Sequence, residues 1–321
     1  MTDERPADSA SPHEDSEDGE GPPPRATLAR FFVLPLLVVG TALLIFLVFN
    51  RMTFERRSPA DELAEVRGGT ANRRWQAAFE LSRSIGRMPP GPERDALSAE
   101  TRRVFDGLSG KRAEDVKVRR YLVLVLGKLL DRAALPQLLA AARDSDPETR
   151  LYAVWALGMI RDPAALEAVL ESSQAQDPGA RKMAAYVLGK LSDPRAIPRL
   201  QVLLGDPVAD VRWNAAIALA SLHDGSGAEV LRSMIDRGAL ARQAPLSGDQ
   251  AEVAMVSALQ ALALLHDPAS LPEIERVARE DPNLKVREAA RKAAEAARAA
   301  TAGAPQKSSE NLERRAALLV G

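Results

Sequence analysis

Residues 181–194 read RKMAAYVLGKLSDP, and three other stretches follow the same plan: RRYLVLVLGKLLDR from Arg119, RLYAVWALGMIRDP from Arg150 and RWNAAIALASLHDG from Arg212. The four arginines are spaced 31 residues apart. In each stretch a leucine follows the arginine after seven residues, a glycine or alanine comes next, and an aspartate comes five residues after the leucine. A sequence period of this length predicts a repeat architecture in which similar units stack on one another.

Two outlying copies extend the pattern when insertions are allowed. RWQAAFELS from Arg74 resembles RWNAAIALA from Arg212, and LALLHDP from Leu262 repeats the end of the unit. The insertions that separate these copies from the regular array cover residues 86–112 and 238–249. Long loops in a regular array are either functional or spacers, and the sequence leaves both possibilities open.

Each unit reads as two helices. The first begins at an Asp-Pro pair such as Asp146-Pro147 or Asp177-Pro178, because aspartate caps free backbone N–H groups and proline suits the first turn. The second begins at the later aspartate of the unit. We expect the aspartate four residues before each arginine to meet it on one helix face, and the small residue to let the two helices approach closely.

The repeat class is indicated by the pattern as a whole. The order DPxxR…A…LG…DP resembles the HEAT-like repeats of the phycobilisome lyase family, over roughly residues 61–300. This resemblance implies an all-α fold, a right-handed α-solenoid of about six helical hairpins. It also implies that the chain is a protein-binding scaffold, since most members of the class are, although a few are enzymes or bind nucleic acid. A composition with 46% apolar but only 4% aromatic residues suits closely packed helices.

The N-terminal region predicts a membrane anchor. FFVLPLLVVGTALLIFLVF, residues 31–49, contains no charge and would rise about 28 Å as a helix, close to the hydrocarbon thickness of a bilayer. The predicted domains are therefore a disordered acidic and Pro-rich tail (1–30), one transmembrane helix (31–50), a basic stalk (51–60), the repeat domain (61–300) and a flexible C-terminal tail (301–321).

These segments predict a single-pass protein, with the bacterial inner membrane as the expected location. A small excess of arginines after the span favours a cytoplasmic repeat domain, but long domains cross membranes whatever their charge, so the side stays open. In the C-terminal tail, residues 311–320 read NLERRAALLV, a weakly amphipathic segment that could dock.

Metal and cofactor chemistry has little support in the sequence. There is no cysteine, and the histidines are His13, His223 and His266. His223-Asp224 and His266-Asp267 look like the paired dipeptides that hold iron in repeat enzymes resembling deoxyhypusine hydroxylase. Both lie at the turn between the helices of a unit, where the aspartate is explained as a helix cap. We therefore predict no metal, no cofactor and no catalysis. The alternative is an enzyme or cofactor-binding protein, lyase-like or hydroxylase-like, with a small-molecule or metal site in the concave groove.

A protein partner is the predicted ligand. We expect the second helices to line the concave face and to offer Glu167, Glu171, Arg199, Glu229, Arg232, Glu273 and Arg276, with Trp213 partly exposed beside them. Their mixed charge argues against nucleic acid, whose backbone needs a basic surface. By alignment, Trp155 and Tyr186 belong to the core. The expected partner is a membrane-associated complex, with lipid contacts made by the span; the sequence determines neither the partner's identity nor the oligomeric state.

Overall fold

The structure is a computed structural model that describes residues 33–53, 58–110 and 112–302. Within these ranges all regular structure is helical and no strand occurs, which confirms the predicted all-α fold. The chain divides into two compact units, Met1–Arg57 and Ser58–Gly321. The predicted N-terminal tail (1–30) and residues 303–321, which include the NLERRAALLV segment, lie outside the described residues.

The described part of the first unit is one helix, α2 (Leu34–Thr53), whose described apolar side chains are exposed. No helix in the described ranges is both long enough and apolar enough to cross a membrane. The uncharged part of α2, residues 34–49, rises about 24 Å, less than the hydrocarbon thickness of about 30 Å, and the helix then continues through Asn50 and Arg51. The predictions of a transmembrane helix over 31–50 and of a single-pass location in a bacterial inner membrane are therefore wrong, and lipid contact through a span is not supported.

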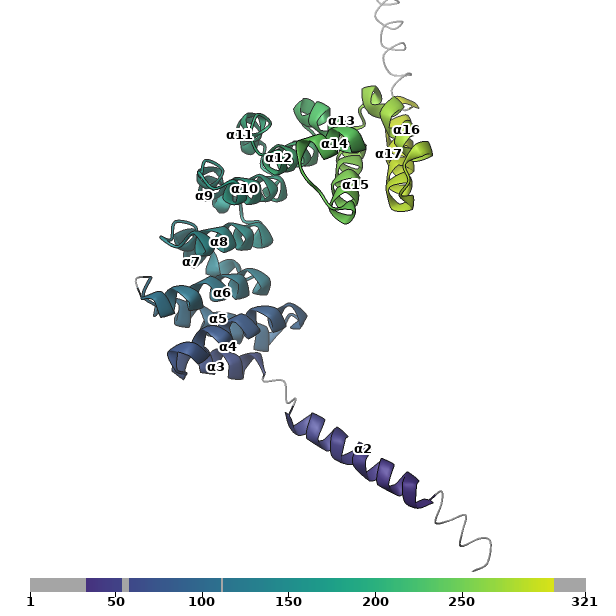
Figure 1. Cartoon of the computed structure of the whole chain (residues 1–321). Coiled ribbons are helices and arrows are strands. Elements are labelled where there is room, and N and C mark those ends of the chain that lie inside the picture. Colours follow the sequence, from purple (N-terminus) through teal and green to yellow (C-terminus); the bar gives the residue numbers. More distant parts are fainter. Residues whose placement is uncertain (1–32, 54–57, 111, 303–321) are drawn as a thin grey trace, which may run out of the picture. The chain divides into compact units, whose positions relative to one another are not determined.

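The second unit is a stack of helical hairpins (Figure 1). The first helices of the hairpins pack side by side in chain order. They are α4 (Ala71–Ser84), α6 (Ala113–Leu129), α8 (Pro147–Ile160), α10 (Pro178–Leu191), α12 (Ala209–Ser221) and α15 (Gly248–Leu265). Each is followed by a second helix: α5 (Pro92–Asp106), α7 (Leu135–Ala141), α9 (Leu166–Ser172), α11 (Ile197–Leu203), α13 (Ala228–Ile235) and α16 (Leu271–Glu280). These six hairpins confirm the predicted solenoid; its right-handed sense stays a prediction.

Two further helices frame this stack, and both insertions are helical. α3 (Pro59–Gly68) packs on α4 at one end, and α17 (Leu284–Ala302) packs on α15 and α16 at the other. The insertion over 86–112 forms most of α5, and the insertion over 238–249 contains the short helix α14 (Arg237–Gln243). Neither insertion is therefore a plain loop.

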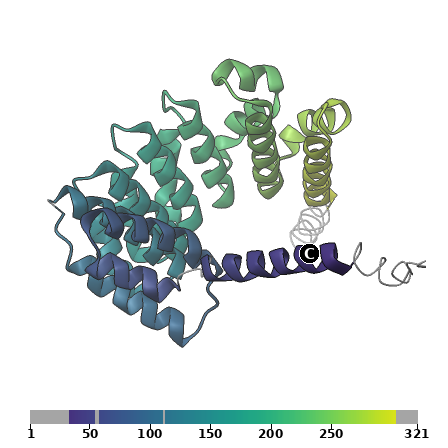
Figure 2. The same ribbon diagram turned by 60° about the horizontal axis from the view of Figure 1, so that its bottom comes forward.

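Within this unit the helix pairs follow an arc, as the two views in Figures 1 and 2 show. The first helices, such as α8, α10 and α12, lie on the inner side of the arc, and the short helices α9 and α11 lie on the outer side. This is the reverse of the expectation that second helices line the concave face. The first helices are longer, and their neighbours contact each other more extensively than the short helices do.

The turn between the two helices of a hairpin is the same in every regular repeat. Leu130, Arg161, Ser192, His223 and His266 all have a positive φ, between 50° and 58°, and are the non-glycine residues with this conformation in the described ranges. The aspartate that follows each of them accepts a hydrogen bond from the backbone N–H two residues later and starts a 3-10 turn. The left-handed residue ends the first helix and the aspartate begins the second element, as in an αL helix cap.

The small residue of the repeat serves the contact between neighbouring hairpins. A Cβ built on Gly127 of α6 would lie 2.6 Å from the Cβ of Ala156 on α8, and one on Gly158 would lie 2.7 Å from Val187 on α10. Gly189 is equally close to Ala218 on α12, at 2.9 Å. The glycines thus set the spacing between consecutive first helices, whereas the sequence suggested a contact within one hairpin.

Candidate functional site

The repeated arginines join each hairpin to its neighbour. In Arg181, Nη1 donates to the carbonyl oxygens of Ala175 (3.0 Å) and Gln176 (2.7 Å), just after α9. Its Nε and Nη2 donate to the two carboxylate oxygens of Asp206, at 2.7 and 3.0 Å, in the next repeat. Such a two-point bond between a guanidinium and a carboxylate is a strong, directional contact. It holds the pKa of Asp206 below its ordinary value.

The other repeats use the same plan, and we call the set Arg119, Arg150, Arg181 and Arg212 the arginine ladder. Arg119 donates from Nε and Nη2 to Asp144, at 3.2 and 2.9 Å. Arg212 donates from Nη1 to the carbonyl oxygens of residues 206 and 207 and from Nη2 to the side-chain oxygen of Gln243. The ladder therefore stabilises the stacking of the repeats.

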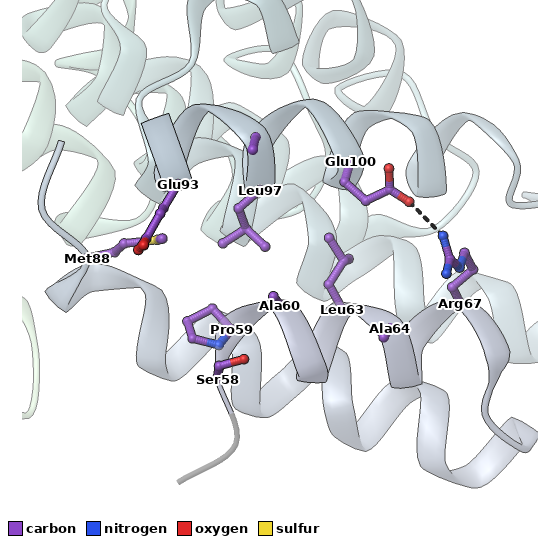
Figure 3. Close-up of a pocket in the computed structure, with 11 residues that line it drawn as sticks. Ser58, Pro59, Ala60, Leu63, Ala64, Arg67, Met88, Glu93, Leu97 and Glu100 are labelled. Atoms are coloured by element: carbon purple, nitrogen blue, oxygen red, sulfur yellow. Dashed lines mark hydrogen bonds and ion pairs between the residues drawn. The ribbon is translucent and has the colours of Figure 1, made fainter. Parts of the chain in front are cut away.

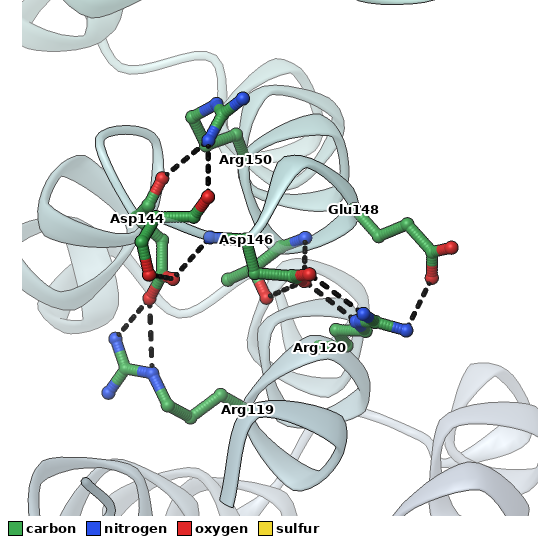
Figure 4. A network of polar contacts seen from close by, with 8 residues as sticks. Arg119, Arg120, Asp144, Asp146, Glu148 and Arg150 are labelled. Atoms are coloured by element: carbon green, nitrogen blue, oxygen red, sulfur yellow. Dashed lines mark hydrogen bonds and ion pairs between the residues drawn. The ribbon is translucent and has the colours of Figure 1, made fainter. Parts of the chain in front are cut away.

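The expected pairing of each arginine with the aspartate four residues earlier is not what joins the repeats. Asp146 caps the backbone N–H of Thr149 and accepts two hydrogen bonds of 2.7 Å from Arg120 of the preceding repeat (Figure 4). Arg120 also donates to Glu148 at 2.7 Å. The hydrogen bonds from Arg120, followed by those from Thr149, lower the pKa of Asp146 to about 2.

An apolar hollow of about 640 Å³ lies over the inner helices α8, α10, α12 and α15; we call it the inner hollow. Its apolar and aromatic lining comes from Trp155, Met183, Tyr186, Trp213, Ile217, Met234, Leu246, Val253 and Ala254. Tyr186 and Val253 are 44% and 65% exposed, so apolar surface is open to solvent here. Its charged lining is the ion pair of Lys182 with Asp210, 2.9 Å long, and Asp249, which forms no salt bridge with a described residue.

The aromatic residues do not all lie where the sequence placed them. Tyr186, predicted to be a core residue, is exposed, so that prediction is wrong, whereas Trp155 is half-buried. Trp213, predicted to be partly exposed, is only 5% exposed, and its Nε1 donates to the side-chain oxygen of Gln243 at 3.3 Å. The curvature of the stack decides these outcomes, and it does not appear in the alignment of the repeats.

The seven predicted charged residues lie on the second helices, away from the inner hollow. Several already bond within the stack. Arg199 donates to the Oγ and the carbonyl oxygen of Ser173 (both 2.7 Å), Arg232 pairs with Asp267, Arg276 with Asp236 and Glu171 with Arg143. Glu167 and Glu229 are exposed, and one buried oxygen of Glu273 has no hydrogen-bond partner among the described residues. Their role in partner binding stays a prediction.

The two His-Asp dipeptides are part of the turns. His223 and His266 are exposed and hold the left-handed position, while Asp224 and Asp267 cap the next backbone segment. No group of three or more potential ligands that could hold a metal ion occurs in the part of the chain that the structure describes.

A second apolar hollow, of about 570 Å³, lies between α3 and α5 at the end of the stack (Figure 3). Leu63 and Leu97 face each other across it, Met88 lies at one end, and the ion pair of Arg67 with Glu100, 3.1 Å long, closes the other end. Its lining offers no residue pattern that indicates a reaction.

Comparison with known proteins agrees with this fold. The family profile of HEAT repeats matches residues 106–177 and 168–247. Comparison with curated protein sequences yields no match. Among solved structures, the complex of CpcE and CpcF of phycocyanin lyase from Nostoc sp. PCC7120 matches with a TM-score of 0.52 and 20% identity, over 74% of this chain and 87% of that chain. The X-ray structure of YIBA from E. coli matches with a TM-score of 0.50 and 17% identity, over 73% and 81%.

These matches confirm the predicted HEAT-repeat class, with a fold shared with phycocyanin lyase subunits. They also correct the prediction that the chain is not an enzyme. That prediction rested on the scaffold role of most repeat proteins, yet a lyase complex has the same fold. At 20% identity the similarity shows a common fold and leaves the activity to be argued from the site.

Proposed function

We propose that the repeat unit binds a protein partner through the inner hollow. The observation that carries this proposal is the open apolar surface of Tyr186 and Val253 beside Trp155, on helices whose other faces are buried. Aromatic residues at the centre of an apolar depression are typical of the positions that dominate binding energy between proteins. Exposed apolar surface that several helices share also marks interaction sites in soluble domains.

The lining indicates what the partner presents. Apolar side chains of the partner would fill the hollow, and a lysine or arginine would lie opposite Asp249, the carboxylate without a salt bridge in the described structure. The pair of Lys182 and Asp210 is already neutral, so it adds polar contacts at the rim without requiring a charged partner group. A partner segment with an apolar face and one cation therefore fits this hollow better than an acidic segment.

Site-specific photocrosslinking tests the proposal in cells that express the full chain. A photoreactive phenylalanine analogue at position 186 should form a crosslink to one defined protein, and the same analogue at position 202 should not. Val253→Glu should abolish that crosslink, because it places a charge in the hollow. Val202→Glu is the matched control: Val202 is 63% exposed, as open as Val253, but lies on the outer helix α11.

Purified components decide the outcome. The crosslinked protein, once identified, should bind the isolated chain and should bind the Val253→Glu variant at least ten times more weakly. Equal effects of Val253→Glu and Val202→Glu, or equal crosslinking from positions 186 and 202, would refute binding through the inner hollow.

One observation favours a second function, lyase-like or cofactor-binding. The volume of the inner hollow, about 640 Å³, lies within the range of small-molecule sites, and its aromatic lining would stack on a planar apolar ligand. Mass spectrometry and absorbance of the denatured full chain test this function. A stoichiometric small molecule that is lost in the Trp155→Ala variant would favour it over protein binding.

A further inference from the structure

The arginine ladder has one incomplete step. In the complete steps, the Nε and Nη2 atoms of an arginine bind an aspartate 25 residues later: Arg119 binds Asp144, and Arg181 binds Asp206. The residue 25 positions after Arg150 is Ala175. The acceptor carboxylate is therefore missing for Arg150 alone among the three ladder arginines followed by a regular repeat.

Arg150 is nevertheless held like the others. Its Nη1 donates to the carbonyl oxygens of Asp144 (2.8 Å) and Ser145 (2.9 Å), as Nη1 of Arg181 does to residues 175 and 176 (Figure 4). These are its hydrogen bonds within the described part of the chain. Because Nη1 is fixed in the same way, the Nε–Nη2 edge of Arg150 is directed as in Arg181, toward the place that a carboxylate would occupy.

That place is hollow. Arg150 and Ala175 both line a depression of about 660 Å³, together with Pro147, Val154 and Ala180. In the neighbouring step the aspartate side chain occupies the equivalent space. A side chain of one methyl group leaves room here for a carboxylate to approach the guanidinium edge.

The acids around the depression do not neutralise Arg150. Asp144 pairs with Arg119, Glu171 pairs with Arg143 at 2.8 Å, and Asp177 accepts from the backbone N–H of residue 180. These three carboxylates also favour a ligand of single negative charge, because they repel a doubly charged phosphate more strongly.

We propose that the Nε–Nη2 edge of Arg150 binds a carboxylate of a protein partner, from an aspartate or glutamate side chain or from a chain terminus. The ligand would complete the ladder from outside, with the two parallel hydrogen bonds that Asp206 makes to Arg181. The site lies between α8, α9 and the start of α10, at the end of the hairpins where the ladder runs, and is separate in its lining from the inner hollow.

NMR of the full chain labelled with ¹⁵N-arginine tests this site, with propionate as the probe and sodium chloride at equal ionic strength as the control. We expect a saturable shift of the Arg150 Nε–H signal with propionate and none with chloride; Arg150→Lys assigns the signal by removing it. The Arg181 Nε–H signal, whose acceptor is already present, should not move.

Ala175→Asp is the decisive variant. It supplies the missing carboxylate, so the Arg150 signal should move to the position of the Arg181 signal without any ligand and should no longer respond to propionate. A propionate titration without saturation, a response that survives in Ala175→Asp, or inorganic phosphate binding more tightly than propionate would each overturn the proposal. Val253→Glu should leave the titration unchanged, so this result is independent of the inner hollow.

Discussion

Replacing Gly127 by alanine should destabilise the repeat unit, although alanine is the better helix former. The added Cβ would lie 2.6 Å from the Cβ and 2.8 Å from the Cα of Ala156 on the neighbouring helix. Neither atom can rotate away, so α6 and α8 must separate, and overpacking of this kind costs about 2–3 kcal/mol. The gain in helix propensity from glycine to alanine is about 1 kcal/mol. We expect a net loss of about 1–2 kcal/mol in the free energy of unfolding.

Urea unfolding followed by circular dichroism at the helix band measures this loss. Gly68→Ala in α3 is the control, because a Cβ there would meet no atom within 4 Å, and we expect that variant to be as stable as the natural chain or slightly more stable. If Gly127→Ala is also as stable as the natural chain, the close contact between the first helices does not set their spacing, and the packing argument fails.

Three further outcomes follow from the described contacts. The pKa of Asp146, held at about 2 instead of 3.8, contributes stability that is present above pH 3.8 and is lost as the pH falls through 2; Asp146→Asn should therefore lower the free energy of unfolding at pH 7 by about 2 kcal/mol and flatten its decline below pH 4. Arg181→Gln should cost about 1–2 kcal/mol more than Arg150→Gln in urea unfolding, because only Arg181 leaves a carboxylate without its cation; equal costs would contradict the ladder. Leu130→Gly should raise the melting temperature, since glycine removes up to about 1 kcal/mol of left-handed strain at φ 53°, and an unchanged or lower temperature would show that the strain is relieved elsewhere.

Much of the fold could be predicted because its determinants are local. The period of 31 residues, the Asp-Pro helix starts and the aspartate after each turn are short-range signals, and the structure contains the corresponding hairpins, caps and turns. The alignment of His223 and His266 with Leu130, Arg161 and Ser192 also located five residues of one backbone conformation. The apolar run before the repeats was a weaker guide, because the length of the uncharged helix, and not its composition alone, decides whether it can cross a membrane.

The candidate site could not be predicted, because it depends on which side of the hairpins faces inward. The sequence period identifies buried and exposed positions on each helix, but it does not give the direction in which the stack curves, which is set by packing between hairpins. The alignment therefore assigned Tyr186 to the core, and the seven charged residues were chosen from the outer helices. Likewise, the sequence shows an alanine at position 175, but only the contacts of Arg181 with Asp206 reveal that Arg150 lacks an acceptor there. Local chemistry in the sequence thus determined the repeating unit, and contacts between units decided where the chain has a free surface and a free charge.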